Sequence, residues 1–493
     1  MGAPQQQAIT TPEAIRLALE HHRAGRLPEA EAIYRRILDV EPGNFDALHL
    51  LGTIACQVGR YGLSVELIEK ALAIKADFAE AWSNRGGALE ALRRYGDAIA
   101  SYDKALAIRP GFAEALYNRG NALLALERCD EAVASYDGAI AVRPDYAEAL
   151  SNRGNALRDL KRYDEALASY ARALAIKPDY AIAHWNESLC RLRTGDFERG
   201  LEEYEWRSRC EELRPPKREF AQPRWLGEEE VAGKTILLHA EQGLGDTIHF
   251  CRYAQPLERK GAKVILEVQP ALKSLLSGVA GAHAVLAQGE ALPQFDLHCP
   301  LLSLPLAFKT RLESIPAAIP YVSIAPAMTE KWQRRLPQKS ALRIGIAWSG
   351  NRDNTRDSAR SIALKKLARI AGPGVTLVSL HNSLRSEDEP DLAANGHILH
   401  FGSELDDFSD NAALASLMDL VISVDTSIAH LAGALGKPVW VLLAFAADWR
   451  WLTDREDSPW YPTAKLYRQN AIGDWDGVME RVERDLVSRF IRS

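Results

Sequence analysis

Residues 113–146 read AEALYNRGNALLALERCDEAVASYDGAIAVRPDY, and residues 147–180 repeat them as AEALSNRGNALRDLKRYDEALASYARALAIKPDY. Outward from this pair, the same 34-residue pattern occupies 11–44, 45–78 and 79–112, and a degraded copy occupies 181–214. One place in the pattern holds Gly52, Gly86, Gly120 and Gly154, and another holds Tyr34, Tyr102, Tyr136 and Tyr170. Units that recur in register at this length bury their apolar faces against their neighbours, so the pattern predicts a stacked helical array.

The pattern resembles the tetratricopeptide repeat (TPR), in which each unit is a pair of helices. Small residues let the two helices approach, and tyrosine fills the space between them. A proline closes most units because it cannot continue the second helix: Pro42, Pro110, Pro144 and Pro178. The resemblance implies an α-superhelix of five TPR repeats and a degraded sixth over 11–214, with a concave groove that binds a peptide. Oligomerisation through the repeats stays open.

Asparagine recurs along this predicted groove. One repeat position holds Asn84, Asn118, Asn152 and Asn186, and Asn121 and Asn155 lie three residues further on, on the same helix face. A carboxamide donates and accepts hydrogen bonds, so such a ladder could hold a peptide backbone of almost any sequence. The other interpretation is that these side chains bridge adjacent repeats. Asparagine is a poor helix former, which slightly favours the peptide interpretation. So does a resemblance to the TPR arm of the eukaryotic O-GlcNAc transferase, whose peptide groove carries an asparagine ladder.

Composition restricts the class of protein. The chain has 493 residues, enough for more than one domain, and its net charge of −6 argues against nucleic acid as the main ligand. Six cysteines are scattered without C-x-x-C spacing, which predicts reduced thiols and no zinc site. The first residues lack a signal-peptide pattern, and the longest apolar stretch is too short to span a bilayer. The sequence therefore predicts a cytoplasmic protein with no membrane span and no metal.

The second half has a different pattern of apolar residues. Residues 215–233 carry Pro215, Pro216 and Pro223 and predict a linker that packs on a surface. Short apolar runs then alternate with helical stretches. The candidate strands are Thr235–Ala240, Lys263–Val268, Phe295–His298, Leu342–Trp348, Val375–Leu380, Ile398–Phe401, Leu420–Val424 and Pro438–Leu443. Such runs predict parallel sheets covered on both faces, in two Rossmann-like halves at 234–330 and 340–493. Two such halves facing a cleft form the GT-B glycosyltransferase architecture.

Two strand–helix turns carry candidate chemistry. In Gly243-Leu-Gly-Asp246, the glycines permit a tight turn and close approach of the backbone to a ligand. In Asp425-Thr-Ser-Ile-Ala-His430, a helix begins at about Ser427, and its free N–H groups suit a diphosphate. Either turn alone could be a plain helix cap. Together, at the carboxyl ends of strands in two halves, they predict the two walls of one site.

The second half resembles the ADP-heptose heptosyltransferase family of bacterial glycosyltransferases, in the subgroup fused to TPR repeats. The resemblance implies that Asp246 is the catalytic base. It implies donor-binding roles for residues of both turns and of the loop after Leu342–Trp348: Gly243, Gly245, Trp348, Asn351, Arg360, Ser361, Asp425, Thr426, Ser427 and His430. An aromatic block, Asp448-Trp-Arg-Trp451 and Asp457-Ser-Pro-Trp-Tyr461, is typical of the subgroup and forms either a ligand wall or packing. Some members of this architecture are similar to flagellin glycosyltransferases.

These observations predict a metal-independent, inverting enzyme that moves a sugar from a nucleotide sugar to a protein, at Ser/Thr hydroxyls and with flagellin as one candidate acceptor. No cofactor is predicted beyond the nucleotide-sugar substrate. Arg360 and helix N–H groups would stabilise the leaving diphosphate, and Asp246 would deprotonate the acceptor, with His249 as the alternative base. The N-terminal half is short for a complete acceptor half, which favours a protein substrate held by the TPR groove. Two other classes stay open: a glycan or lipooligosaccharide transferase with a recruiting TPR arm, and a non-catalytic TPR adaptor.

Overall fold

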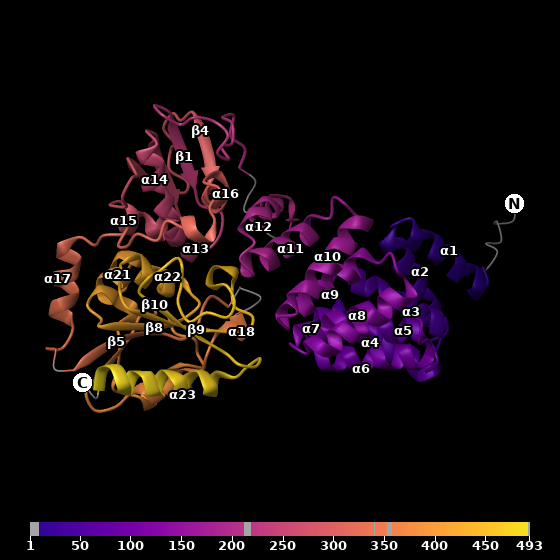
Figure 1. Cartoon of the computed structure of the whole chain (residues 1–493). Coiled ribbons are helices and arrows are strands. Elements are labelled where there is room, and N and C mark those ends of the chain that lie inside the picture. The colour runs from indigo at the N-terminus through magenta and orange to yellow at the C-terminus, as the bar shows by residue number, and fades with distance from the viewer. Residues whose placement is uncertain (1–8, 212–217, 340, 353–356, 492–493) are drawn as a thin grey trace, which may run out of the picture. The chain divides into compact units, whose positions relative to one another are not determined.

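A computed structural model of the chain describes residues 9–211, 218–339, 341–352 and 357–491 (Figure 1). The chain divides into two compact units, residues 1–183 and 184–493. The helix pair at the degraded sixth repeat, α11 (Ala181–Arg193) and α12 (Phe197–Tyr204), lies almost entirely in the second unit.

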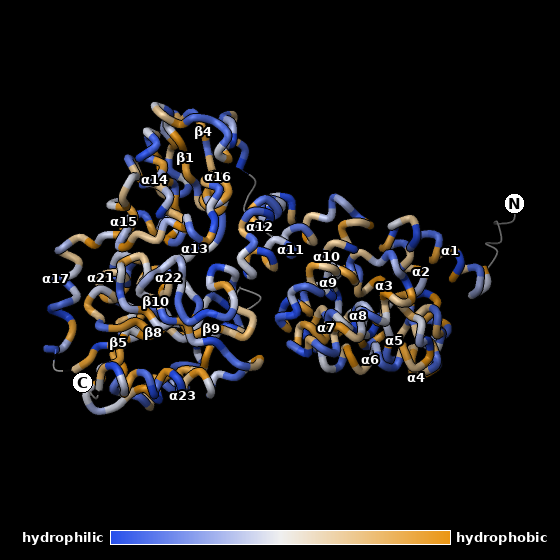
Figure 2. Tube along the Cα trace, in the orientation of Figure 1, coloured by the Kyte–Doolittle hydropathy of each residue, from blue (hydrophilic) through white to orange (hydrophobic). Residues whose placement is uncertain are grey.

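The first unit consists of helices that begin at the predicted repeat boundaries. They are α1 (Thr11–Arg23), α2 (Leu27–Val40), α3 (Phe45–Gln57), α4 (Tyr61–Ile74), α5 (Ala79–Ala91), α6 (Tyr95–Ile108), α7 (Ala113–Ala125), α8 (Cys129–Val142), α9 (Ala147–Asp159) and α10 (Tyr163–Ile176). Each second helix ends two residues before the position where most units carry proline. The tube in Figure 2 alternates between hydrophobic and hydrophilic residues along these helices, as expected where one face packs and the other meets solvent.

The recurring glycine and tyrosine make the central contact inside a repeat. A Cβ on Gly120 would lie 2.5 Å from Cε1 of Tyr136, and Gly86 and Gly154 have the same relation to Tyr102 and Tyr170. These tyrosine rings are fully buried. Glycine therefore recurs because the first helix passes directly over a tyrosine of the second, and any side chain would separate the two helices.

An arginine ladder joins successive repeats. Arg119 donates from Nε to Asp103 Oδ1 at 2.6 Å and from Nη1 to Ser135 Oγ at 2.5 Å. Arg153 makes the same pair of bonds with Asp137 and Ser169. Each arginine thus binds the second helix of its own repeat and that of the repeat before it, which fixes the stacking of neighbouring units.

The second unit contains two parallel sheets. The four-stranded sheet has the order β3 (Ala284–Ala287), β2 (Lys263–Val268), β1 (Thr235–His239) and β4 (Leu297–Pro300). The six-stranded sheet has the order β10 (Ala464–Arg468), β9 (Val439–Leu443), β8 (Leu420–Val424), β5 (Leu342–Ala347), β6 (Val375–Ser379) and β7 (Ile398–His400). In Figure 1 the helices α13 and α22 lie between the two sheets, and the long C-terminal helix α23 runs below the larger one.

Helices of the second unit are mostly short. After α11 and α12 they are α13 (Leu244–Phe250), α14 (Ala254–Arg259), α15 (Lys273–Leu276), α16 (Leu304–Ala307), α17 (Pro326–Arg335), α18 (Asp357–Arg360), α19 (Leu364–Leu367), α20 (Glu389–Ala394), α21 (Phe408–Ser416), α22 (Ser427–Ala434) and α23 (Trp475–Leu486). The helix α17 falls in the segment between the two sheets, where the sequence predicts the division.

All eight predicted strands are present, with ends shifted by up to two residues. Two further strands, β3 and β10, are not among the candidate strands predicted from the sequence. Both are edge strands, paired on one side only, and their burial pattern is less continuous than that of the central strands β8 and β9. An edge strand needs no unbroken apolar run, so the pattern that identified the other strands was absent here.

The linker and the degraded repeat both pack on the second unit. Phe220 lies against the rings of His239 and His298 on the smaller sheet, and Trp225 N donates to His298 O at 2.8 Å. Residues 215–217 of the predicted linker lie outside the described residues. From α12, Phe197 and Tyr204 each contact the ring of Trp449. Loss of the repeat pattern after 181 therefore has a packing cause: this helix pair contributes to the core of the α/β unit.

Candidate functional site

Asp246 lies in the first turn of α13, directly after β1. Its Oδ2 accepts from the backbone N–H of Gly243 at 3.0 Å, so it caps the helix. Its Oδ1 accepts from Arg450 Nη2 at 2.5 Å, and Arg450 follows β9 of the other sheet. Burial raises the pKa of the Asp246 carboxyl, although the Arg450 guanidinium opposes that rise. The carboxylate is thus both a helix cap and one half of an ion pair between the two sheets.

Arg450 holds two carboxylates at once. Besides Asp246 it binds Asp448 Oδ1 through Nη1 at 2.8 Å, and its guanidinium stacks over the rings of Phe250 and Trp449. Only 8% of its side chain is exposed, so the positive charge is largely shielded from water. From the sequence alone, Arg450 stands out only as a member of the aromatic block. The feature of the sequence that could have identified Arg450 as a site residue is a charged side chain between two tryptophans, Trp449 and Trp451, close to Asp448.

His249 occupies a buried position on α13. Its Nδ1 lies 2.8 Å from the hydroxyl of Tyr461, and its ring packs on Trp460 with centroids 4.5 Å apart. Burial, with the Arg252 guanidinium nearby, holds the pKa of His249 well below its usual value. Because its ring is enclosed by side chains, an acceptor hydroxyl cannot reach His249 in this conformation.

The turn after β8 faces α13. The helix α22 begins at Ser427, as predicted, but Thr426 makes no side-chain cap; its Oγ1 lies 3.2 Å from Ser423 Oγ. A Cβ on Gly245 would lie 3.0 Å from His430 Cδ2 and 3.6 Å from Ser427 N. Gly245 therefore permits a close approach to the first turn of α22.

Asp425 and His430 face each other across this turn. His430 Nε2 lies 4.0 Å from Asp425 Oδ1, and its ring stacks on Trp451 with centroids 5.3 Å apart. Burial raises the pKa of Asp425 to about 6, with the Asp448 carboxylate adding to the rise. Burial lowers the pKa of His430 to about 3, with the Arg450 guanidinium adding to the fall. His430 is accordingly neutral near pH 7.

The loop after β5 contributes Arg360. Its Nη1 donates to the backbone oxygen of Asp425 at 3.1 Å, which places the guanidinium beside the turn. Ser361 donates to Asp357 Oδ1 at 3.2 Å, so it supports this loop. Trp348 is buried, and its Nε1 donates to Asp388 Oδ2 at 2.8 Å. Asn351 is exposed.

The structure therefore brings together part of the site predicted in the second half. Asp246, Gly245, Asp425, Ser427, His430 and Arg360 meet where α13 faces α22. Trp348 does not join them, because its side chain is used in packing against Asp388 and His381. The aromatic block is interior: Trp449, Trp451, Trp460 and Tyr461 are all buried.

The asparagines of the repeats divide into two groups. Asn84 Nδ2 bonds His49 Nε2 at 3.0 Å and Thr53 Oγ1 at 3.2 Å, both in the preceding repeat. Asn152 Nδ2 bonds Tyr117 and Asn121 in the same way, at 3.1 and 2.9 Å. Asn121 and Asn155 accept from Tyr136 and Tyr170. These four side chains make structural hydrogen bonds within or between repeats. This agrees with the interpretation that the asparagines bridge adjacent repeats.

Asn118 differs from its equivalents. Its side chain has no hydrogen-bond partner within the described ranges 9–211, 218–339, 341–352 and 357–491. By the register of Asn84 and Asn152, its partners would be residues 83 and 87, and residue 87 is a glycine. The half-buried amide of Asn118 is thus available to a ligand. Asn186 lies on α11 in the second unit and is buried.

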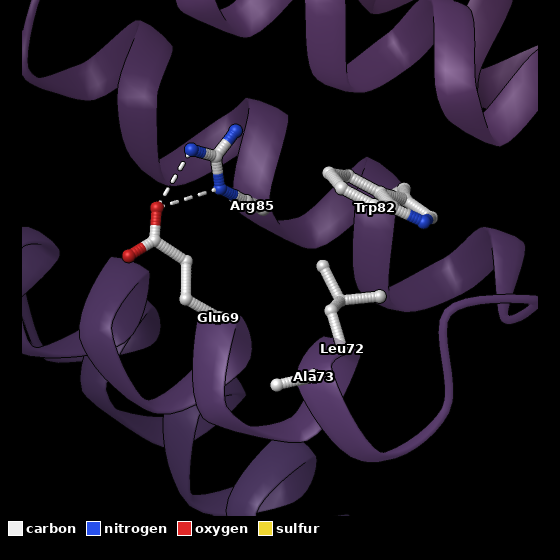
Figure 3. Close-up of a pocket in the computed structure, with 5 residues that line it drawn as sticks. All are labelled: Glu69, Leu72, Ala73, Trp82 and Arg85. Atoms are coloured by element: carbon white, nitrogen blue, oxygen red, sulfur yellow. Dashed lines mark hydrogen bonds and ion pairs between the residues drawn. The ribbon is translucent and has the colours of Figure 1, made fainter.

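The repeats also carry a hollow of about 340 Å³ between α4 and α5 (Figure 3). Leu72, Ala73 and Trp82 form its apolar wall, and Arg85 reaches across to Glu69 at 2.7 Å. Trp82 stands where the next two repeats have leucine. The tryptophan therefore makes this surface different from its equivalents along the array.

The described residues hold neither a membrane-spanning helix nor a cluster of metal ligands. No helix among them is long and apolar enough to cross a membrane. Within the same ranges, no group of three or more His, Cys, Asp or Glu side chains is arranged to hold a metal ion.

Comparison with known proteins identifies the repeats. Residues 15–77 and 117–181 match the family Tetratricopeptide repeat, and residues 91–127 match the family TPR repeat. The first unit is built from tetratricopeptide repeats. Such repeats are suited to binding protein segments.

A curated relative extends beyond the repeats. Protein FlbA of Caulobacter vibrioides (strain ATCC 19089 / CIP 103742 / CB 15) is 26% identical over 317 residues, which cover 59% of this chain and 52% of FlbA. The chain thus spans about half the length of this relative. Because the match is longer than residues 1–183, it includes part of the second unit.

Solved structures are similar over about a third of the chain. A crystal structure of MamA is 24% identical and covers 33% of this chain and 96% of MamA, with a TM-score of 0.32. A tetratricopeptide repeat protein from Parabacteroides merdae ATCC 43184 is 22% identical and covers 39% of this chain and 77% of its own, with a TM-score of 0.36.

Proposed function

We propose that the second unit is a glycosyltransferase of the GT-B type, which moves a sugar from a nucleotide sugar to a protein acceptor recruited by the TPR repeats. One observation carries the proposal. Two helices that follow strands of two different parallel sheets, α13 and α22, meet with Asp246, Asp425, His430, Arg360 and Arg450 around their contact. Ligands of parallel α/β sheets bind outside the carboxyl ends of the strands, where these residues lie.

In this proposal, the two guanidinium groups stabilise the leaving diphosphate. Arg360 already lies beside the turn that begins α22, and Arg450 is buried between Asp246 and Asp448. Fixed positive groups in a site shielded from water stabilise developing negative charge strongly, and they can act in place of a divalent cation. The reaction is then a metal-independent, inverting displacement, in which the acceptor oxygen attacks the anomeric carbon as the diphosphate leaves.

Asp246 is the better candidate for the base. A base that works near neutral pH needs a pKa above the ordinary value for aspartate, and burial shifts the pKa of Asp246 in that direction. His249 has the opposite properties: its pKa is lowered and its ring is enclosed. Asp246 must separate from Arg450 before it can accept a proton, and an incoming diphosphate offers Arg450 another partner.

The asparagines of the repeats support two different kinds of acceptor. Asn118, with its available amide, supports a peptide in the groove of the repeats. The bonds that Asn84 and Asn152 make between repeats support the second candidate, in which the TPR arm recruits a partner while a glycan or lipooligosaccharide is the acceptor. A non-catalytic adaptor would not need the cluster of ionised groups around Asp246.

The test is intact-mass analysis of proteins co-expressed with the chain in its native host, comparing wild type with Asp246→Asn. A base variant should lose roughly 10²–10⁴-fold in rate while it still binds nucleotide. Asp474→Asn is the matched control, because Asp474 also caps a helix, α23, through Gly477 N at 2.9 Å. Activity in EDTA should persist. A wild-type chain that adds no sugar to any protein, yet glycosylates a lipid-linked acceptor, would favour the second candidate.

A further inference from the structure

The hydroxyl of Tyr461 lies between two buried histidines from helices that follow different sheets. It is 2.8 Å from His249 Nδ1 on α13 and 3.0 Å from His430 Nδ1 on α22. The ring of Tyr461 is closely held, since a Cβ on Gly433 would lie 2.3 Å from it and the Arg252 guanidinium lies 4.6 Å from its centre. The hydroxyl therefore has a fixed position between the two imidazoles.

The donors and acceptors in this group can be counted. A neutral imidazole has one N–H donor and one acceptor nitrogen, while a phenol has one proton to donate and can also accept. Both histidines are neutral near pH 7 because burial lowers their pKa values, that of His430 to about 3. The single proton of Tyr461 can then go to at most one Nδ1, and a histidine that does not receive it must donate from its own Nδ1. The hydroxyl of Tyr321 lies further away, 3.5 Å from that of Tyr461; it donates to Ile248 O at 3.0 Å and accepts from Arg252 Nη2 at 2.9 Å.

Two features decide which histidine is the donor. His430 Nε2 lies 4.0 Å from Asp425 Oδ1, where an N–H is attracted to the carboxylate and a lone pair is repelled. His249 Nε2 is buried and lacks a hydrogen-bond partner among the described residues. A buried N–H without a partner is rarer than a buried acceptor without one. Both features place the protons on His430 Nε2 and His249 Nδ1.

We propose that Tyr461 is a positioning residue that fixes His430 as its Nε2–H tautomer, so that the ring presents a hydrogen-bond donor beside Asp425. In this arrangement Tyr461 accepts from His249 and donates to His430. A donor at that position suits an anionic oxygen, such as one of a leaving diphosphate. The identity of the anion rests on the proposed function, whereas the tautomer does not.

The experiment uses the full chain with 15N-labelled histidine and measures the tautomers of His249 and His430 from their ring nitrogen shifts. The two residues are assigned from the signals lost in His249→Gln and His430→Gln. Tyr461→Phe removes the hydroxyl and keeps the ring that packs on Gly433. Tyr467→Phe is the control, because the hydroxyl of Tyr467 bonds Asp485 at 2.8 Å and contacts neither histidine. Calorimetry with UDP, GDP and ADP measures nucleotide affinity.

In wild type we expect Nε2–H at His430 and Nδ1–H at His249. Tyr461→Phe should shift His430 toward a mixture of tautomers and weaken the nucleotide that binds by about fivefold, the effect of one hydrogen bond. Tyr467→Phe should change neither. The proposal is overturned if wild-type His430 carries its proton on Nδ1, or if Tyr461→Phe leaves both tautomers unchanged. If the tautomers are as expected and no nucleotide binds wild type, the positioning role stands and the proposed function fails.

Discussion

Replacing Asn152 with alanine tests whether the asparagine ladder is structural. The side chain donates to Tyr117 and to Asn121 in the preceding repeat. Each lost hydrogen bond costs about 0.5–1.5 kcal/mol, and alanine returns up to about 0.7 kcal/mol through its higher helix propensity. Asn152→Ala should therefore lower the free energy of opening of this part of the array by about 0.5–2.5 kcal/mol.

Asn118→Ala is the matched control. This asparagine occupies the equivalent position in the preceding repeat, but its two register partners are Ser83 and Gly87, and its amide bonds neither of them within the described ranges. No bond is lost, so the substitution should leave stability unchanged or raise it by up to about 0.7 kcal/mol. The two variants should then differ by about 1–3 kcal/mol, although they make the same chemical change on the same helix position.

Hydrogen exchange of the full chain, resolved by peptides from α7 and α9, measures these free energies locally. Exchange in peptides from the second unit serves as an internal reference. Equal destabilisation by Asn118→Ala and Asn152→Ala would refute the assignment of bridging and available asparagines. If only Asn118→Ala weakens capture of a protein acceptor, this amide contacts the acceptor.

Two further predictions follow from packing and from titration. Gly120→Ala should destabilise the repeats by about 1–3 kcal/mol, because its Cβ would meet Tyr136 at 2.5 Å. The same hydrogen-exchange experiment measures this loss. Gly96→Ala should cause no such loss, because a Cβ there has nothing within 4 Å. His430 has a pKa of about 3 when folded against 6.5 when unfolded, so the unfolded state binds the extra proton and this histidine lowers stability below pH 6.5 by about 1.4 kcal/mol per pH unit. The lowered pKa values of His239, His249 and His381 act in the same direction. His430→Gln should reduce the slope of stability with pH by that amount in urea unfolding followed by tryptophan fluorescence, and an unchanged slope would contradict the lowered pKa of His430.

The sequence determined the repeat unit almost completely. Helices begin at Phe45, Ala79, Ala113 and Ala147, at the predicted repeat boundaries, and the recurring glycines meet the recurring tyrosines. This is possible because contacts in a repeat array are local, within one unit or to the next, so a 34-residue pattern contains both partners of each contact. The positions of Asn84 and Thr53 within their repeats can also be read from the sequence, but only the structure shows that the two side chains form a hydrogen bond.

Only the tertiary structure decided how the second unit is assembled. Asp246 and Arg450 are 204 residues apart in the chain, and His249 and Tyr461 are 212 apart, yet both pairs are in contact. Strand patterns and turn motifs predicted two sheets and placed Asp246 and Asp425 at strand ends. They could not predict which side chain of a later loop would neutralise Asp246, or that Gly245 would pack on α22. Those contacts depend on how two separately formed sheets pack together, and no periodic pattern in the sequence records that packing.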